Sequence, residues 1–432
     1  MKILWLNTNL LLPLDKGGKL RTWHVMRELA KQHEITYVCF ADPSQTAADR
    51  EGMREVCARL ETVTRTDAGK GTLRFYVDVA RYLVDSAPYA VAKYRSKAFR
   101  ERVAALLRSE AFELVVCDFL FPAINLPERL PCPSLLFTHN VEAEIWRRHT
   151  ANASNGFTRR LLRQQWQRML RFEGRALRRF DLVLAVSEVD KETFAHLYPD
   201  GVRQPIHVVH TGVDTRFFSP SQTQGDKAHL VFTGSMDWLP NEDAMVAFVN
   251  QILPLVREQI PDVTLSIIGR APTPSVQRLG DTSGITVTGR VDDVRPHIAA
   301  GTVYVVPLRI GGGTRLKIFE AMAMGKAVVS TTIGAEGLPV TPGENILIAD
   351  EPAAFANAVV HLLRDAGMRQ RLASEARRLV VERYDWSAVA ADFEAALDRV
   401  RRGDAAGDER SSVTGPRPTS AARNEENLVG SL

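Results

Sequence analysis

The chain has 432 residues, more than a single hydrophobic core normally supports, so we expect two domains of about 200 residues each. Its 45% hydrophobic and 25% charged residues are typical of a globular protein, and they exclude a disordered, collagen-like or disulfide-stapled class. The formal net charge of +4, from 55 basic and 51 acidic residues, indicates no partner by itself. No uncharged apolar run reaches the roughly 18 residues that a membrane span needs.

The first predicted element is a strand in residues 1–7, which hold one lysine and a short apolar run. This segment lacks the small-residue cleavage site of a signal peptide, so we expect a cytoplasmic protein. A glycine turn at 15–21, a helical pattern at 23–30 and an apolar run at 35–40 follow it. Strand, turn, helix and strand in this order form a βαβ unit and predict a parallel sheet. Further near-continuous apolar strands, typical of a sheet covered on both faces, occur at 114–117, 134–137 and 182–186.

A second series of elements begins near residue 229 and predicts a second Rossmann-like sheet. We therefore assign residues 1–205 to an N-terminal domain and 206–385 to a C-terminal domain. From Gly403 onward, glycine, serine, proline, asparagine and mixed charges without apolar periodicity predict a disordered tail at 403–432. The strands of the second series are expected at 230–234, 265–269, 285–287, 303–306 and 327–331, with helices at about 241–259 and over 352–401.

Two Rossmann-like domains in tandem bring the carboxyl ends of two parallel sheets opposite each other. Ligands of such sheets bind at those ends. The sequence thus predicts an α/β protein with two parallel-sheet domains that face a central cleft, and places the chemistry in that cleft.

The strongest local signal lies in residues 307–326, where a buried strand runs into three glycines and then a helix that begins at about Thr314. Glycines let the backbone approach a ligand, and a helix N-terminus attracts anions. The cations Arg315 and Lys317 are unfavourable in a first helical turn unless an anion also binds there. These features predict a diphosphate site, although a tight turn with two solvated cations stays an alternative. The predicted diphosphate ligands are Gly311, Gly312, Gly313, Thr314, Arg315 and Lys317.

The N-terminal half offers a second set of candidates. The pair Gly17 and Gly18 opens the first helix and resembles a phosphate-approach loop, although it lacks a dinucleotide fingerprint and no Walker sequence occurs in the chain. Asp118 and His139 each follow a strand at the ligand-binding end of the sheet, where they could meet a sugar hydroxyl or a developing cationic centre. A structural role for either residue stays open. No Asp-x-Asp pair or His/Cys cluster with metal spacing is present, so we expect no metal.

With these residues the sequence resembles glycosyltransferase family 4, whose members have the GT-B fold. The resemblance covers about residues 1–400 and implies a retaining enzyme that transfers a sugar from a nucleotide diphosphate donor, usually without metal. The matching segments are 181–187, 208–214, 311–313, 320–331, 333–338 and 382–387.

For the donor, the resemblance implies that Glu320 holds the ribose, as the second glutamate of a family motif whose first position is Gly312 here. The family's diphosphate-gripping Arg and Lys follow the strand that ends at Gly234. Residues 235–241 carry neither, so we infer that Arg315, Lys317 and the glycine amides take that role. The other implied roles are base contact through Arg290 and Val291, a catalytic polar site at Asp118 or His139, diphosphate and acceptor contact by Gly17 and Gly18, and a helix at 386–402 that crosses back to the N-terminal domain.

We therefore expect a glycosyltransferase of the hexosyltransferase type that uses a UDP- or GDP-sugar as donor substrate and no cofactor. The acceptor would be a saccharide or a lipid-linked saccharide, in polysaccharide biosynthesis. A nucleotide-sugar epimerase or phosphorylase of the same fold and a non-catalytic nucleotide-sugar-binding protein stay open as alternatives.

A basic stretch at 157–180 holds eight arginines against the single acid Glu173. It indicates peripheral contact with the inner face of the membrane or with an acceptor's phosphate, or else a solvated helix face. We expect no nucleic-acid partner, because Trp166 and Phe172 are the only aromatic residues interleaved with the arginines, between the phenylalanines at the two ends of the stretch.

Overall fold

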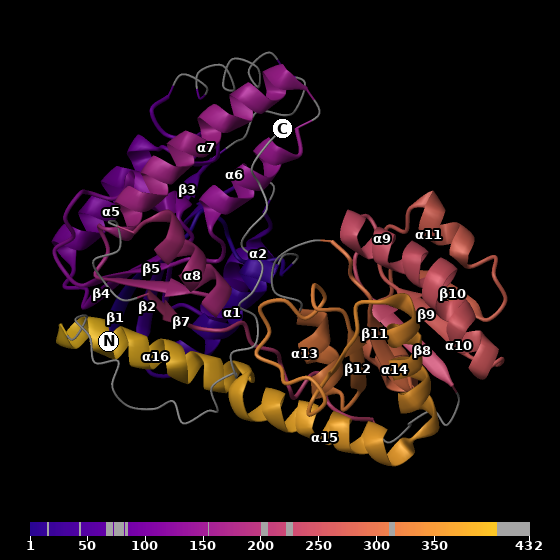
Figure 1. Ribbon diagram of the computed structural model, residues 1–432. Helices are drawn as coiled ribbons and strands as arrows, with labels where there is room; N and C mark the ends of the chain where they lie inside the picture. Colours follow the sequence, from indigo (N-terminus) through magenta and orange to yellow (C-terminus); the bar gives the residue numbers. More distant parts are fainter. Residues whose placement is uncertain are drawn as a thin grey trace.

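A computed structural model describes residues 1–14, 17–42, 45–65, 72, 82, 85–153, 155–199, 206–221, 228–310 and 316–403. Two α/β domains stand side by side, each built on a parallel sheet with helices on its faces (Figure 1). The sheets have seven and six strands. The predicted fold class of two Rossmann-like domains is confirmed.

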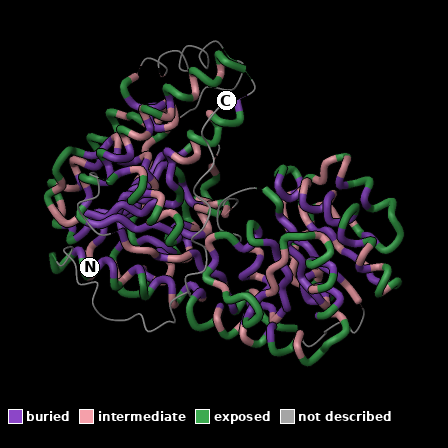
Figure 2. Tube along the Cα trace, viewed as in Figure 1, coloured by how far each residue is buried: buried purple, intermediate pink, exposed green. Residues whose placement is uncertain are grey.

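The N-terminal sheet has the strand order β3-β2-β1-β4-β5-β6-β7, and every pair is parallel. Its central strands are buried on both faces (Figure 2), which explains their near-continuous apolar sequence. The last strand pairs with β6, so the N-terminal domain extends beyond the predicted boundary at 205/206. The strands are β1 (Lys2–Leu6), β2 (Glu34–Ala41), β3 (Arg59–Thr64), β4 (Leu114–Asp118), β5 (Ser134–Phe137), β6 (Leu182–Ala185) and β7 (Ile206–Val208).

The helices of this domain include a long antiparallel pair, α6 and α7, of which α7 contains most of the basic stretch. Glu173, the one acid of that stretch, is buried and accepts hydrogen bonds from the backbone N–H groups of Glu142 and Ala143 at 2.8 and 3.1 Å. It thereby caps the first turn of α6. The helices are α1 (Gly17–Leu29), α2 (Ala47–Gly52), η1 (Met53–Glu55), α4 (Tyr89–Ala92), α5 (Lys97–Ser109), η2 (Phe121–Asn125), α6 (Glu142–Ala151), α7 (Gly156–Leu177) and α8 (Glu188–Leu197).

The C-terminal sheet has the order β10-β9-β8-β11-β12-β13, again all parallel. The helix predicted at 241–259 is interrupted by a π-helical turn, η3, just before Pro254, which has no N–H for a regular ladder. The strands are β8 (His229–Thr233), β9 (Thr264–Ile268), β10 (Ile285–Gly289), β11 (Val303–Val306), β12 (Ala327–Ser330) and β13 (Leu347–Ile348); the helices are α9 (Leu239–Ala247), η3 (Phe248–Ile252), α10 (Leu253–Gln259), α11 (Pro274–Leu279), α12 (Arg295–Ala300), α13 (Leu316–Ala323), α14 (Pro352–Arg364) and α15 (Ala366–Arg383).

The last described helix, α16 (Trp386–Arg402), leaves the C-terminal domain and packs against α1 and β5 of the N-terminal domain (Figure 1). Phe393 is fully buried there, with its ring stacked on Trp5 at 5.6 Å and edge-on to Phe137 at 5.1 Å. At the crossing point the backbone N–H of Val213 donates to the carbonyl of Tyr384 at 2.7 Å. Residues 404–432, which include nearly all of the predicted tail, lie outside the described part of the chain.

Candidate active site

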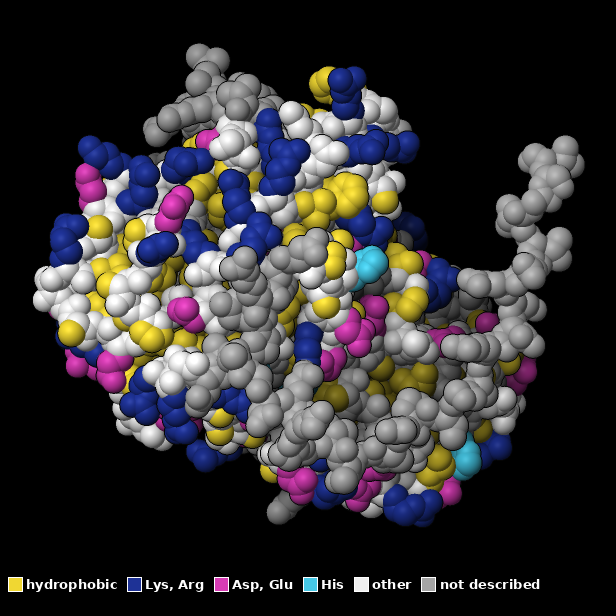
Figure 3. Space-filling model, turned by 60° about the vertical axis from the view of Figure 1, so that its left-hand side comes forward, with side chains coloured by type: hydrophobic (Ala, Val, Ile, Leu, Met, Phe, Trp, Pro, Cys, Tyr) yellow, Lys and Arg dark blue, Asp and Glu magenta, His cyan; other side chains and the backbone are white. Residues whose placement is uncertain are grey.

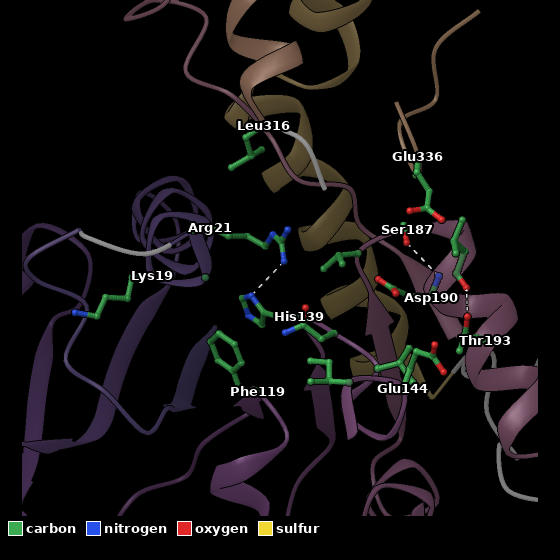
Figure 4. Close-up of a pocket in the computed structure, with 18 of the residues that line it drawn as sticks. Lys19, Arg21, Phe119, His139, Glu144, Ser187, Asp190, Thr193, Leu316 and Glu336 are labelled. Atoms are coloured by element: carbon green, nitrogen blue, oxygen red, sulfur yellow. Dashed lines mark hydrogen bonds between the residues drawn. The ribbon is translucent and has the colours of Figure 1, made fainter. Parts of the chain in front are cut away.

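A cavity of about 610 Å³ lies at the carboxyl end of the N-terminal sheet. Most of its wall comes from the segments that follow β1, β4, β5 and β6, as expected for a doubly wound sheet. The C-terminal domain closes one side with Leu316, Glu336 and Gly337. Figure 4 shows Arg21 and His139 facing each other in this space, with Leu316 across from them.

Asp118 lies beneath this cavity and is fully buried. Its carboxylate accepts hydrogen bonds from Trp5 Nε1 at 3.1 Å, Asn7 Nδ2 at 2.6 Å and Thr22 Oγ1 at 2.7 Å, and from His139 Nε2 at 2.7 Å. Asp118 does not line the cavity. A ligand in the cavity would therefore meet His139 and not Asp118, whose carboxylate accepts from four donors within the protein. The catalytic role of either residue stays a prediction.

His139 lines the cavity, but its side chain is only 2% exposed. Its Nδ1 lies 3.2 Å from Nη1 of Arg21, and its ring stacks on Phe119 with centroids 3.7 Å apart. Burial lowers the pKa of His139, and the Arg21 charge lowers it further, against the opposing effect of Asp118. A neutral imidazole thus donates from Nε2 to Asp118 and accepts at Nδ1 from Arg21, so both ring nitrogens are engaged within the protein.

Gly17 and Gly18 line the cavity at the start of α1. A Cβ at Gly18 would lie 2.6 Å from the Cζ atom of Phe119, whereas a Cβ at Gly17 would meet nothing within 4 Å. Phe119 itself has a φ of 67°, which is strained for an aromatic residue. Gly18 therefore accommodates the Phe119 ring, and Gly17 leaves the helix N-terminus open to a ligand.

Arg21 is the residue of this site that the sequence analysis missed. It is 8% exposed, and its Nη2 donates to Thr211 Oγ1 in the segment after β7. Burial lowers the pKa of Arg21 to about 10, although the charges of Asp190 and Asp118 oppose the shift. One sequence signal pointed to its burial: Arg21 lies on the same face of α1 as Thr22, Val25 and Met26, which are buried. A cation without a partner is costly on such a face.

On the C-terminal side, Lys317 and Glu320 both lie on α13. Lys317 Nζ donates to Asn241 Oδ1 at 2.8 Å and lies 4.1 Å from the centre of the Phe232 ring. Its ammonium group thus reaches the carboxyl end of β8. Glu320 is half-buried, and burial raises its pKa to about 7 despite the nearby charge of Lys317. Neither side chain lines the 610 Å³ cavity.

The remaining predicted residues are dispersed or lie outside the described chain. Arg290 is exposed after β10, and Val291 packs partly against the C-terminal core, so neither is brought to the cavity. Within the residues that the structure describes, no group of three or more His, Cys, Asp and Glu side chains is placed to hold a metal ion. The diphosphate candidates that lie outside the described residues are Gly311, Gly312, Gly313, Thr314 and Arg315.

Comparisons with known proteins agree with this architecture. Over most of its length, the chain is 21% identical to an uncharacterized 44.6 kDa protein in the cps region of Klebsiella pneumoniae, a match that covers 89% of this chain and 96% of that protein. It is also 35% identical over 147 residues to a phosphatidyl-myo-inositol mannosyltransferase of Mycobacterium leprae, across 33% of this chain and 39% of that enzyme.

Two solved structures show the same fold. They are Anabaena HepE in complex with UDP and glucose, with a TM-score of 0.61, 16% identity and coverage of 92% of this chain and 99% of that chain, and sucrose-phosphate synthase of Thermosynechococcus elongatus, with a TM-score of 0.64, 17% identity and coverage of 93% and 99%.

Two family profiles divide the chain at the same place as its two sheets. Residues 16–217 match the family described as Glycosyltransferase Family 4, and residues 227–365 match the one described as Glycosyl transferases group 1. With a domain of glycosyltransferase family 4 followed by a domain of glycosyl transferases group 1, the chain is a glycosyltransferase, and it has the GT-B fold.

Proposed function

We propose that this enzyme transfers a hexose, with retention of configuration, from a UDP- or GDP-sugar to a saccharide or lipid-linked saccharide in polysaccharide biosynthesis. The observation that carries the proposal is the cavity at the carboxyl end of the N-terminal sheet. The C-terminal domain forms one side of this cavity. The relative encoded in a cps region and the neighbour that binds UDP and glucose support it.

In this proposal the C-terminal domain binds the donor and the N-terminal domain binds the acceptor. Negative charge grows on the departing diphosphate, so cations and backbone N–H groups around it would stabilise the transition state. Lys317, Arg315 and the glycine amides before α13 are the proposed ligands of that charge, and Glu320 is the proposed ligand of the ribose. Closure between the domains would keep out water, which would otherwise hydrolyse the donor.

Replacing Lys317 with alanine should weaken nucleoside diphosphate binding by about 1.5–3 kcal/mol, the usual contribution of a charge-assisted hydrogen bond. Calorimetry with UDP and GDP measures the change. Arg278→Ala, at an exposed position on α11 of the same domain, is the matched control and should leave the affinity unchanged. If Lys317→Ala binds UDP and GDP as tightly as the parent protein does, Lys317 is not a ligand of the diphosphate.

The donor and the reaction type are tested together. A thermal-shift screen of UDP- and GDP-sugars should reveal the donor, because a ligand that binds only the native state raises the melting temperature. Product analysis with the best donor then separates the activities: transfer requires an added acceptor, whereas epimerisation proceeds without one. Turnover of the donor into an epimer in the absence of acceptor would contradict the proposed transfer.

The first turns of the basic stretch lie at the exposed tip of the α6–α7 pair. Phe157, in the first turn of α7, is 81% exposed. Figure 3 shows Lys and Arg side chains interspersed with hydrophobic ones over this domain. An apolar groove at the tip is lined by Arg147, Thr150, Ala151, Gly156, Arg159, Arg160, Arg163 and Trp166.

We propose that this tip binds an anionic membrane surface, because arginines around an exposed aromatic side chain suit lipid headgroups. None of the described helices has the length and apolar character needed to cross a bilayer, so contact would be peripheral. The helix α6 also lines the cavity through Glu144, Ile145 and Arg148, which would place a lipid-linked acceptor beside the site.

A triple substitution of Arg159, Arg160 and Arg163 by glutamine should weaken binding to vesicles that contain phosphatidylglycerol by about 3 kcal/mol, at roughly 1 kcal/mol for each charge. Co-sedimentation at low salt measures the effect. The matched control replaces the exposed arginines Arg278, Arg371 and Arg383 of the C-terminal domain in the same way. If both triple variants sediment like the parent protein, the tip is a solvated helix face.

A further inference from the structure

Within the described part of the chain, the buried cation Arg21 forms no ion pair that would balance its charge. Its hydrogen-bond partners, His139 and Thr211, are both neutral. Among the described residues, no carboxylate hydrogen-bonds to it; Asp190 and Asp118 act on it through their fields alone. A guanidinium group removed from water in this way is costly unless an anion meets it.

The position of Arg21 tells where that anion would lie. Its side chain lines the cavity between the domains, opposite Leu316 of α13. The other cations of the wall are engaged locally: Arg148 pairs with Glu144 at 2.9 Å, and Lys19 Nζ donates to the carbonyl of Pro13 at 3.1 Å. Among the described residues of the wall, Arg21 is therefore the buried cation that has neither a carboxylate nor a carbonyl as hydrogen-bond partner.

We propose that Arg21 binds a phosphate group of a ligand in this cavity and that Asp118 and His139 position it for that purpose. The inference rests on the proposed function and extends it by one residue from the N-terminal domain. A guanidinium has five N–H donors in a planar fork that matches phosphate oxygens. The bonds to His139 and Thr211 occupy one donor on each terminal nitrogen, which leaves the second N–H of each for a ligand.

The roles of Asp118 and His139 follow from the direction of their hydrogen bonds. Asp118 accepts from Nε2 of His139 and so fixes the tautomer in which Nδ1 carries a lone pair. That lone pair accepts from Nη1 of Arg21 and sets the plane of the guanidinium. In this series of hydrogen bonds, His139 is a positioning residue and Arg21 is the residue that contacts the ligand.

A phosphate in this cavity has two sources: the diphosphate of the donor, or a phosphate carried by a lipid-linked acceptor. Calorimetry on the full chain distinguishes them with three probes, namely UDP, GDP and inorganic phosphate added to the UDP-saturated or GDP-saturated protein. The variants are Arg21→Gln, which removes the charge, and Arg21→Lys, which keeps it. Thr211→Val is the matched control, because it removes a partner of Arg21 and leaves the guanidinium in place. Circular dichroism melting shows that each variant is folded.

If Arg21 binds the donor diphosphate, Arg21→Gln weakens UDP or GDP binding by about 10- to 100-fold, Arg21→Lys by less, and Thr211→Val by no more than about twofold. If it binds an acceptor phosphate, nucleotide affinity is unchanged and inorganic phosphate binds the parent protein but not Arg21→Gln. A folded Arg21→Gln variant that binds all three probes like the parent would overturn the proposal. Failure of the parent to bind either nucleotide would instead contradict the proposed donor, and phosphate binding to the nucleotide-free protein would then decide the role of Arg21.

Discussion

Replacing Asp118 with alanine is expected to lower the free energy of unfolding by about 3–5 kcal/mol, the usual cost of removing one partner from a buried charged network. The change leaves the donors of Trp5, Asn7 and Thr22 and that of His139 without their acceptor, in a place that is closed to solvent. Since native proteins are stable by only about 5–15 kcal/mol, this is a large share of the total. Urea unfolding followed by circular dichroism measures it.

Asp181 offers a matched control at the opposite end of the same sheet. Its carboxylate accepts from the backbone N–H and hydroxyl of Ser134 at 2.8 Å each, but the residue is exposed. Asp181→Ala should therefore cost about 1 kcal/mol. If the two alanine variants lose the same free energy of unfolding, the four donors beneath the cavity find other hydrogen-bond acceptors, and Asp118 is not needed to hold them in place.

The substitution Phe393→Ala should cost a similar amount, about 3–5 kcal/mol, as for other fully buried phenylalanines. Phe393 joins the last helix to the N-terminal sheet through its contacts with Trp5 and Phe137. Loss of this ring should loosen α16 from the N-terminal domain as well as lower the melting temperature. Calorimetric melting and amide hydrogen exchange along residues 386–402 measure the two effects.

The exposed Asp392, next to Phe393 on the same helix, is the control position. Asp392→Ala should change the stability by no more than about 0.5 kcal/mol. If Phe393→Ala melts like the parent protein and its last helix exchanges no faster, then the packing of that ring does not hold α16 to the N-terminal domain.

The sequence predicted the central strands well because they are buried on both faces and therefore read as apolar runs. The three strands it missed lie at sheet edges: β3 and β7 in the N-terminal sheet and the two-residue β13 in the C-terminal one. In β3 every residue is at least partly exposed, so Arg59–Thr64 mixes charged and β-branched side chains. β7 has only three residues and gives no detectable period.

Only part of the candidate site could be predicted from the sequence. Asp118 and His139 could be placed at the ligand-binding end of the sheet because each stands at the carboxyl end of a strand. Their contact depends on the pairing of β4 with β5, which the structure reveals. Their division of roles could not be predicted, since it depends on which polar groups are buried beneath the cavity. Arg21 went unnoticed because an arginine within a helix is usually solvated, and its place beside Thr22, Val25 and Met26 is a weak sign of burial on its own.

The path of the polypeptide has a consequence for biosynthesis. The apolar face that Val389, Phe393 and Leu397 cover belongs to the first domain of the chain, yet these residues are among the last of the described part to be translated. The amino-terminal half therefore leaves the ribosome with an uncovered hydrophobic surface, and it stays exposed to aggregation until the other half has been made. A fragment that ends after β7 would leave that surface permanently exposed to solvent. Expression of the N-terminal domain as a separate protein therefore requires that residues 386–402 be supplied with it.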